Sequence, residues 1–179
     1  MRTVSKAALA LILALATSLV GYFEGAIPHT YADPVGIPTI CTGHTGPDVV
    51  PGRIAQPGEC ERLLQQDLTT AYLQVTRCIG VPLLPNQAAA LTSFAFNVGG
   101  DALCSSTLAR LANQGRPAAE WCAELDRWVY ARKGGQSWKL PGLVRRRAAE
   151  RALCEGRAWL PAALRLPDAT RTRALARAA

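Results

Sequence analysis

The feature that most constrains this chain is an apolar run near its N-terminus, residues 7–20, which only Thr17 and Ser18 interrupt. Arg2 and Lys6 precede the run. A basic stretch followed by a short apolar one is the layout of an export signal. The run is rich in Ala, and it is short for a stable transmembrane helix, which needs about 20 apolar residues.

Three fates of this segment are open from the sequence. Ala14-Leu15-Ala16 offers a small-x-small cleavage site. Alternatively, the run is a weak anchor that inserts into the bilayer and can later leave it. The third reading, an ordinary buried helix of the fold, is disfavoured by the flanking positive charges. Glu24 follows Val20 by only four residues, so an anchored chain would hold Glu24 at the membrane surface. If Glu24 does chemistry, anchoring is a way to keep the protein inactive.

The cysteine count also favours export. The chain has 179 residues, enough for one domain with a core, and six Cys, an even number that permits three disulfides. So many paired cysteines would be unusual in a reducing cytosol. There is no C-x-x-C motif and no cluster of His, so no metal site is predicted. His29 and His44 with Asp33 are too isolated to favour one.

The net charge of +7 lies entirely in residues 139–179, because the charges of residues 1–138 cancel. A basic block of this kind favours polyanions such as anionic lipid, wall polymer or nucleic acid. A solvated basic helix with a loose tail explains the charge equally well. A nucleic-acid partner fits the charge but not the export signal, so we expect none.

The pattern along the rest of the chain predicts an α+β fold that is mostly α. Residues 31–45 combine Pro and Gly with residues that favour extended structure, which predicts a small hairpin. Apolar spacing and helix-end residues predict helices over 59–79, 85–99, 105–115, 117–131 and 142–156. We therefore expect an anchor or signal segment (1–21), a domain with a small β lobe, a larger helical lobe and a cleft between them (22–158), and a basic, poorly ordered tail (159–179).

Two carboxylates and a hydroxyl lie where the apolar run ends. Glu24 and Asp33 are nine positions apart, and Thr39 follows Asp33 by six. Cleavage of a glycosidic bond needs a carboxylic acid to protonate the leaving oxygen and a carboxylate on the other side to activate water or attack carbon. Burial near an apolar helix end helps an acid to keep its proton. By spacing alone this motif is weak, since surface carboxylates and a strand Thr fit it as well.

The surrounding residues make the motif specific. The segment "FEGAIPHTYADPVGIPTICTGHT" (23–45) resembles the catalytic segment of phage-type lysozymes, glycoside hydrolase family 24. The similarity continues in "LTSFAFNVGGDALCSSTLARLANQG" and "CAELDRWVYARKGGQSWKLPGLVRRRAAERALCEG" and covers roughly residues 22–158. This sequence departs from the family pattern at Cys41-Thr42, where many relatives have Gly and an aromatic. That departure concerns the shape of the hairpin and not the two acids.

The resemblance implies a lysozyme-like fold and a set of residue roles. Glu24 would be the general acid, Asp33 would hold the water or the developing cation, and Thr39 would position that water. The helix with Asn97 lines the family's saccharide cleft, and Trp138, in a Gly-rich loop, is a candidate to stack on a sugar. One Arg of Arg145, Arg146 and Arg147 is expected to pair with Glu24, and the sequence does not say which.

The resemblance also bears on the cysteines and the anchor. Six Cys allow fifteen pairings, and family topology favours Cys41–Cys60, Cys78–Cys104 and Cys122–Cys154. Some endolysins of the family carry a signal-anchor-release segment, which the N-terminus here resembles. In one subgroup an anchor Cys frees a catalytic Cys by disulfide exchange. Here the anchor has no Cys and Asp33 occupies the second acid position, so we expect topological rather than thiol control.

The resemblance thus implies an endolysin muramidase that hydrolyses the MurNAc–GlcNAc β-1,4 bond of peptidoglycan for host lysis, without a cofactor. We expect a monomer that is exported, tethered to the inner membrane through residues 7–20, and then periplasmic. One alternative is a lytic transglycosylase, against which Asp33 and Thr39 argue. Another is a non-enzymatic cationic binder of wall or membrane.

Overall fold

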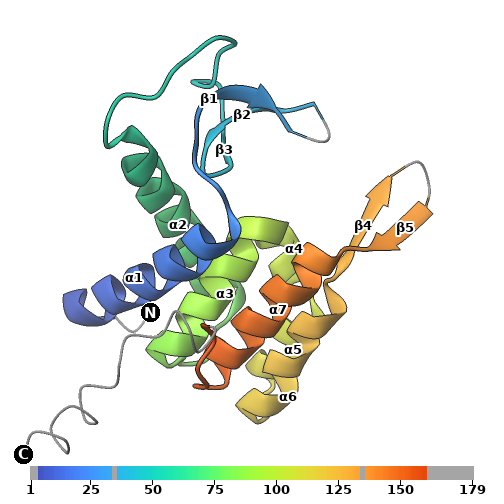
Figure 1. Ribbon diagram of the computed structural model, residues 1–179. Coiled ribbons are helices and arrows are strands. Elements are labelled where there is room, and N and C mark those ends of the chain that lie inside the picture. The colour runs from blue at the N-terminus through green and yellow to red at the C-terminus, as the bar shows by residue number, and fades with distance from the viewer. Residues whose placement is uncertain (1–3, 34–35, 134–135, 161–179) are drawn as a thin grey trace, which may run out of the picture.

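The computed structural model describes residues 4–33, 36–133 and 136–160. The predicted poorly ordered tail lies outside these residues from position 161 onward. Figure 1 shows the described elements, which are α1 (Lys6–Phe23), β1 (Ile27–Ala32), β2 (Pro38–Cys41), β3 (His44–Thr45), α2 (Glu59–Cys78), α3 (Pro85–Val98), α4 (Gly100–Cys104), α5 (Thr107–Asn113), α6 (Ala118–Ala123), the 3-10 helix η1 (Glu124–Arg127), β4 (Tyr130–Lys133), β5 (Gln136–Lys139) and α7 (Pro141–Cys154).

The apolar run forms helix α1, which packs into the fold. Ser5 caps its start, since the Ser5 hydroxyl accepts a hydrogen bond from the backbone N–H of Ala8 at 3.2 Å. The buried residues of α1 recur three or four positions apart and face the main core, where the helix packs on α3; they are Ile12, Ala16, Leu19 and Val20. The reading that the sequence disfavoured, a helix of the fold, therefore describes residues 6–23 in this structure.

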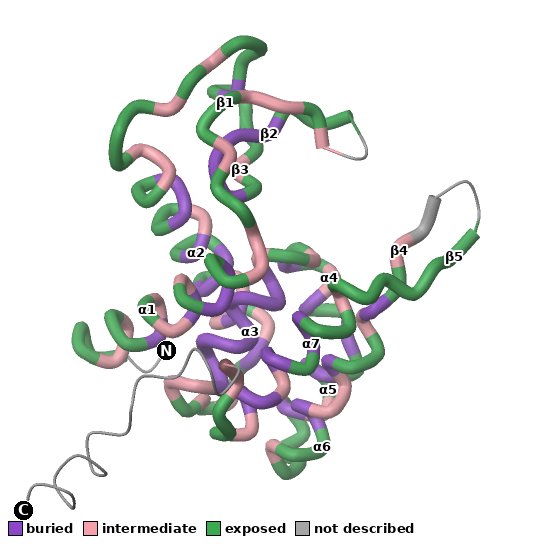
Figure 2. The backbone as a smooth tube through the Cα atoms, viewed as in Figure 1, coloured by how far each residue is buried: buried purple, intermediate pink, exposed green. Residues whose placement is uncertain are grey.

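Helix α3 is the centre of the helical lobe. Pro85 stands in its first turn, and Gly99, with φ of 87°, ends it in a backbone conformation that favours glycine. Every residue from 88 to 95 is buried, as Figure 2 shows for the middle of the lobe. Helices α1, α2 and α7 pack around α3. The end of α1 and the inner face of α7 are thereby brought together on one central helix.

The β lobe is a three-stranded antiparallel sheet in the order β1-β2-β3. It lies above the helical lobe in Figure 1 and joins α1 directly through residues 24–26. It has a small core of its own, Ile40, Cys41, Val49 and Leu63, to which α2 contributes Leu63. The predicted hairpin is thus confirmed, and it begins where Glu24 ends α1.

One predicted helix is wrong in its second half. The helix predicted over 117–131 ends as α6 and the short η1, after which residues 130–133 form β4 of a second hairpin. The change occurs at Trp128, whose ψ of 51° lies outside the helical region. Trp138 therefore stands on strand β5 instead of in a loop. The sequence missed this hairpin because the apolar spacing of 117–131 continues through it.

All six cysteines are paired in the structure. The pairs are those that family topology favours: Cys41–Cys60 joins β2 to α2, Cys78–Cys104 joins α2 to α4, and Cys122–Cys154 joins α6 to α7. The first pair fixes the β lobe to the helical lobe. The other two pairs each join two helices within the helical lobe.

Cys41, where the sequence departs from the family pattern, has an unusual backbone conformation. Among the described residues, Cys41 is the one non-glycine residue with positive φ, at 58°. Glycine adopts this left-handed conformation without steric cost, which fits the Gly that the family pattern implies here. In this chain the disulfide to Cys60 and complete burial hold Cys41 in it. The hairpin keeps its shape by a covalent bond instead of by glycine.

Candidate active site

Glu24 stands at the C-terminal end of α1, where helix turns into the sheet. Its backbone is extended, and its N–H still donates to the carbonyl of Val20 at 2.8 Å. This helical bond fixes the direction in which the side chain leaves the helix. The side chain is 33% exposed, so the carboxylate borders both the protein interior and solvent. The sequence predicted this placement at a helix end.

Arg146 of α7 is the cationic partner of Glu24. Its Nη1 contacts Glu24 Oε1, and its Nε contacts Glu150 Oε1 at 3.2 Å. The Ser93 hydroxyl of α3 donates to the same Glu150 oxygen at 2.8 Å. The Arg146 side chain is 4% exposed and that of Glu150 is fully buried. The guanidinium is therefore held from behind by Glu150 and presented to Glu24.

Arg147 turns in another direction. Its Nη1 lies 2.9 Å from Glu150 Oε2, its Nη2 donates to Asn97 Oδ1, and its guanidinium covers the Phe94 ring at 4.9 Å. Burial raises the pKa of Glu150, although Arg147 and Arg146 oppose this shift by favouring the carboxylate. Two buried cations thus share one buried anion, and the remaining anionic partner at this cluster is Glu24.

Asp33 and Thr39 are organised by one residue between them, Ile37. The N–H of Ile37 donates to Asp33 Oδ1 at 2.8 Å, and its carbonyl accepts from the Thr39 hydroxyl at 3.0 Å. The backbone of Asp33 also pairs with Ile37, its N–H donating to the Ile37 carbonyl at 3.0 Å. Thr39 is buried. The backbone of Ile37 therefore binds both the carboxyl group and the hydroxyl.

Tyr31 links the two acids electrostatically. It lies on β1 opposite Thr39 in the antiparallel register. Burial raises the pKa of the Tyr31 hydroxyl, and the negative charges of Glu24 and Asp33 raise it further. Both carboxylates therefore act on one phenol. From the sequence, Tyr31 was interpreted only as a residue that favours strands. Its position two residues before Asp33, in "YAD", was the available signal that it belongs to the site.

The other predicted site residues fall in different places. Asn97, near the end of α3, is exposed and engaged by Arg147. Trp138 on β5 is 47% exposed. Arg145 is exposed on α7 and does not contact Glu24. Sequence reasoning missed Ser93 and Glu150; the signal for Glu150 was its position three and four residues after two arginines, on the same helix face.

His44 lies in a network of its own with two aspartates. His44 Nδ1 lies 2.8 Å from Asp67 and its Nε2 lies 3.3 Å from Asp48, which ties β3 to α2 and to the loop after β3. Within the described ranges, no group of His, Cys, Asp and Glu gathers as a metal ion would require.

The comparison with protein families finds a match over most of the chain. The family model described as phage lysozyme matches residues 21–150, which include Glu24, Asp33, Thr39 and the Arg146–Glu150 pair. The chain belongs to the phage lysozyme family. It is accordingly a glycosidase of the lysozyme class, with the mostly helical fold and small antiparallel sheet described above.

Individual phage lysozymes and muramidases are similar to this chain over most of their own length. The SAR-endolysin of Bacteriophage PS119 is 40% identical over 156 residues, which cover 86% of this chain and 90% of that protein. The muramidase domain of SpmX from Asticaccaulis excentricus is 32% identical, covers 86% of this chain and 98% of its own, and superposes with a TM-score of 0.72.

Two structures of the P1 phage endolysin Lyz allow a comparison of fold states. The active form superposes with a TM-score of 0.70 at 23% identity, covering 84% of this chain and 92% of that one. The secreted inactive form reaches 0.52 at 21% identity, covering 86% and 96%. Both superpositions show the same overall fold, and the fold of this phage lysozyme superposes more closely on the first of the two structures.

Proposed function

We propose that this phage lysozyme is an endolysin muramidase in which Glu24 is the general acid, Asp33 the base that activates water, and Thr39 the group that orients that water. The observation that carries the proposal is the pairing of Glu24, at the end of α1, with a buried arginine of α7. A carboxyl group fixed in this way at the border of interior and solvent can meet a glycosidic oxygen in a constant geometry.

Glu24 gains its position from two independent elements. The helical hydrogen bond to Val20 fixes its backbone, and Arg146 fixes its side chain. Because Glu150 and Ser93 hold Arg146 from the opposite side, the guanidinium cannot follow Glu24 into solvent. Precision of this kind is what a general acid requires, since displacement by about 1 Å can cost about 100-fold in rate.

Asp33 and Thr39 supply the second half of the reaction. Asp33 Oδ1 is held by the N–H of Ile37, and the Thr39 hydroxyl is held by the carbonyl of the same residue. A water molecule bound between the carboxylate and the hydroxyl would have its attacking direction defined by two groups that both bind the backbone of Ile37. A lytic transglycosylase needs no water, so this arrangement favours hydrolysis over transglycosylation.

Asn97 and Trp138 are proposed to contact the glycan. Arg147 donates to Asn97 Oδ1, so the amide NH2 of Asn97 remains to donate to a saccharide. Trp138 offers an exposed indole on β5, and sugar rings stack on such faces. Both contacts would affect substrate binding more than the chemical step.

The test is mass spectrometry of the muropeptides that the oxidised, soluble protein releases from purified peptidoglycan. We expect reducing-end products from the unchanged protein and none from Glu24→Gln. Glu61→Gln is the matched control, because Glu61 is an exposed carboxylate at the start of α2 without an ion-pair partner among the described residues. It should release the same products as the unchanged protein.

The products also separate the alternatives. Fragments lighter by one water would identify a transglycosylase and leave Asp33 without its role. Equal products from the Glu24 variant and the unchanged protein would remove Glu24 from the mechanism. Absence of products from every variant, with binding to the wall retained, would identify a non-enzymatic wall binder.

We further propose that α1 first tethers the protein to the inner membrane and then joins the fold on release to the periplasm. Similar proteins named SAR-endolysin support this. The helix Lys6–Phe23 has 18 residues and is apolar enough to cross a membrane, with a length of about 27 Å at about 1.5 Å per residue. In the membrane, Leu19 and Val20 would face lipid instead of the core, and Glu24 would lie apart from Arg146.

Release can be followed in cells that express the full chain. Dissipating the membrane potential should move the intact protein from the membrane fraction to the soluble periplasmic fraction and start lysis. A shortened soluble protein before this treatment would indicate cleavage by a signal peptidase. If the membrane-bound form stayed inactive only in the presence of a reductant, control would be by thiols and the proposal of topological control would be wrong.

A further inference from the structure

Glu150 is a buried ionisable group for which the proposed reaction has no chemical task. It lies on the face of α7 that packs on α3 and is fully buried. Its Oε1 accepts hydrogen bonds from the Ser93 hydroxyl at 2.8 Å and from Arg146 Nε at 3.2 Å. Its Oε2 lies 2.9 Å from Arg147 Nη1. Two adjacent arginines thus meet the two oxygens of one carboxylate.

Beyond Glu150, the two arginines lead to different parts of the site. Arg146 uses Nε for Glu150 and Nη1 for Glu24. Arg147 uses Nη1 for Glu150 and donates through Nη2 to Asn97 Oδ1. A guanidinium is planar and rigid, so an anion that fixes one of its nitrogens also fixes the direction of the others. Glu150 therefore stands behind both the proposed general acid and the amide proposed to contact the glycan.

Stability alone does not account for this cluster. Arg146 is 3% exposed and Arg147 is 0% exposed. Removing charged groups from water is costly, and well-packed apolar side chains in place of a buried ion pair often leave stability unchanged or raise it. The charged groups supply something that apolar ones would not, which is direction. Each guanidinium points a donor at a residue of the site.

Glu150 holds the two arginines in different ways. Its Oε1 is hydrogen-bonded to both Ser93 and Arg146. Among the described residues its Oε2 has no aligned hydrogen-bond donor, although Arg147 Nη1 lies 2.9 Å away. Arg147 is therefore held by charge, and by the Phe94 ring 4.9 Å from its guanidinium. A neutral side chain at position 150 that keeps an oxygen should release Arg147 more than Arg146.

We propose that Glu150 is a positioning residue for both the chemical step and the binding of the glycan. Through Arg146 it fixes the carboxyl group of Glu24. Through Arg147 it fixes the amide of Asn97, which cannot turn over without losing the bond to its Oδ1, so that its NH2 keeps one direction. The proposal rests on the roles proposed above for Glu24 and Asn97, and it assigns their common support to one residue outside the reaction.

The test is a double-mutant cycle in which kcat and KM are measured on soluble, un-cross-linked peptidoglycan strands. Glu150→Gln keeps an oxygen for Ser93 and Arg146 and removes the charge that holds Arg147. It should raise KM about tenfold, the effect of one lost hydrogen bond to the glycan. It should also lower kcat about tenfold, because a neutral amide holds Arg146 less firmly than a carboxylate does. Arg147→Met should raise KM about tenfold and leave kcat within about twofold.

The double variant shows whether the contacts act as one chain. If Glu150 acts on the glycan through Arg147, Glu150→Gln should add nothing to KM in the presence of Arg147→Met. The KM of the double variant should then equal that of either single variant, and its kcat should equal that of Glu150→Gln. The double variant removes one buried cation together with one buried anion. If Glu150→Gln alone fails to fold, comparing the double variant with Arg147→Met provides the same test of kcat and KM.

Glu155 provides a matched control for Glu150. It stands at the end of α7 and is also a carboxylate shared by two arginines, lying 2.8 Å from Arg151 and 2.5 Å from Arg157. Glu155→Gln makes the same chemical change on the same helix without touching the cluster behind Glu24. It should leave both kcat and KM unchanged.

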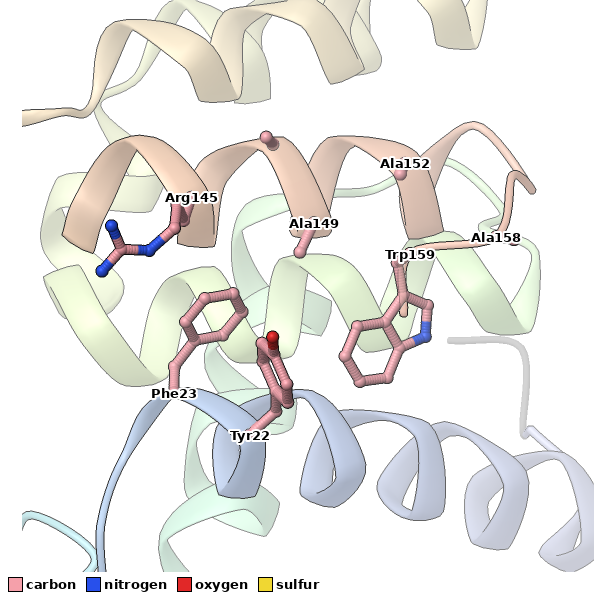
Figure 3. A pocket seen from close by; sticks show the side chains of 8 residues that line it. Tyr22, Phe23, Arg145, Ala149, Ala152, Ala158 and Trp159 are labelled. Carbon is pink, nitrogen blue, oxygen red and sulfur yellow. The ribbon is translucent and has the colours of Figure 1, made fainter. Parts of the chain in front are cut away.

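Arg145 provides the control for Arg147. It is exposed and lines a different feature, a hollow between α1 and α7. Figure 3 shows Arg145 and Phe23 at one end of this hollow and Trp159 at the other. Arg145→Met should leave KM and kcat within about twofold. Because it removes one positive charge, as Arg147→Met does, it separates the loss of the contacts of Arg147 from the loss of charge.

Three results would overturn the proposal. Unchanged kcat and KM in a folded Glu150→Gln variant would show that Glu150 positions neither group. A KM that rises about a hundredfold in the double variant would show that Glu150 and Arg147 act separately. Normal constants for the folded fraction, with activity lost only in proportion to unfolding, would make Glu150 a structural residue. A fully active Glu24→Gln variant would refute the proposed function itself, which none of these three results does.

Discussion

Arg146 contacts Glu24 across 122 positions of the sequence, from the first half of α7 to the end of α1. The contact exists only when α1 and α7 are packed on the same central helix, α3. The ion pair is therefore both a part of the site and a measure of whether the whole fold is assembled.

Arg146→Lys should lower activity by about 100-fold, because one ammonium cannot replace a guanidinium that reaches Glu24 and Glu150 with separate nitrogens. Muropeptide release at saturating substrate measures this. Arg151→Lys is the control on the same helix, since Arg151 pairs with Asp126 and Glu155 at the surface. Equal activity of the two variants would show that Arg146 does not position Glu24.

The disulfide at Cys41 leads to a second prediction. Removing Cys41–Cys60 should lower the free energy of unfolding by about 2–4 kcal/mol. The double variant with Cys41→Gly and Cys60→Ala should be more stable than that with Cys41→Ala and Cys60→Ala by about 1 kcal/mol, because only glycine accepts the positive φ freely. Urea unfolding of both variants measures the difference. Equal stabilities would mean that residue 41 leaves this conformation once the disulfide is gone.

A third prediction concerns acid stability. Arg53 contacts Asp48 at 2.9 Å and also Glu59. The Arg53 hydrogen bond lowers the pKa of Asp48, and the Gln56 N–H together with Arg53 lowers that of Glu59. A carboxyl group whose pKa is lower in the folded than in the unfolded state stabilises the folded protein at pH values above the unfolded pKa of about 4. This stabilisation is lost as the pH falls through the folded-state pKa.

Arg53→Gln should therefore destabilise the protein at neutral pH and make its unfolding midpoint less sensitive to acid. Urea midpoints measured from neutral pH downward provide the test. Arg62→Gln is a weaker perturbation of the same cluster, because the more exposed Arg62 forms an ion pair with one described carboxylate, that of Glu59, at 3.2 Å. Parallel pH profiles for Arg53→Gln and the unchanged protein would contradict the assignment.

The sequence predicted most of what local pattern determines. Helices over 59–79, 85–99 and 142–156 are present to within two residues, because their apolar spacing and end residues are strong. The hairpin after Glu24 followed from Pro, Gly and β-favouring residues. The hairpin of β4 and β5 did not, because Trp128 and Val129 continue a helical spacing while their backbone leaves the helix.

The cluster behind Glu24 could not be predicted in the same way. The sequence offered three adjacent arginines without a way to choose among them. The choice is made by the rotation of α7 on α3, which buries Arg146 and Arg147 and leaves Arg145 in solvent. Ser93 and Glu150 join the cluster for the same reason. Which of several equal charges enters a site is a property of packing, and local sequence does not specify it.

The last prediction separates the two uses of α1. Leu19 and Leu11 contribute equally to the hydrophobicity of a membrane anchor, but Leu19 is fully buried in the core whereas Leu11 is exposed. Leu19→Ala should lower the free energy of unfolding of the released protein by about 2–5 kcal/mol. Leu11→Ala should change it by less than about 0.5 kcal/mol. Urea unfolding of the soluble forms measures both, and membrane fractionation before release should show equal tethering. If both variants had the same stability, α1 would not be part of the core after release, and Glu24 would have to reach Arg146 by another path.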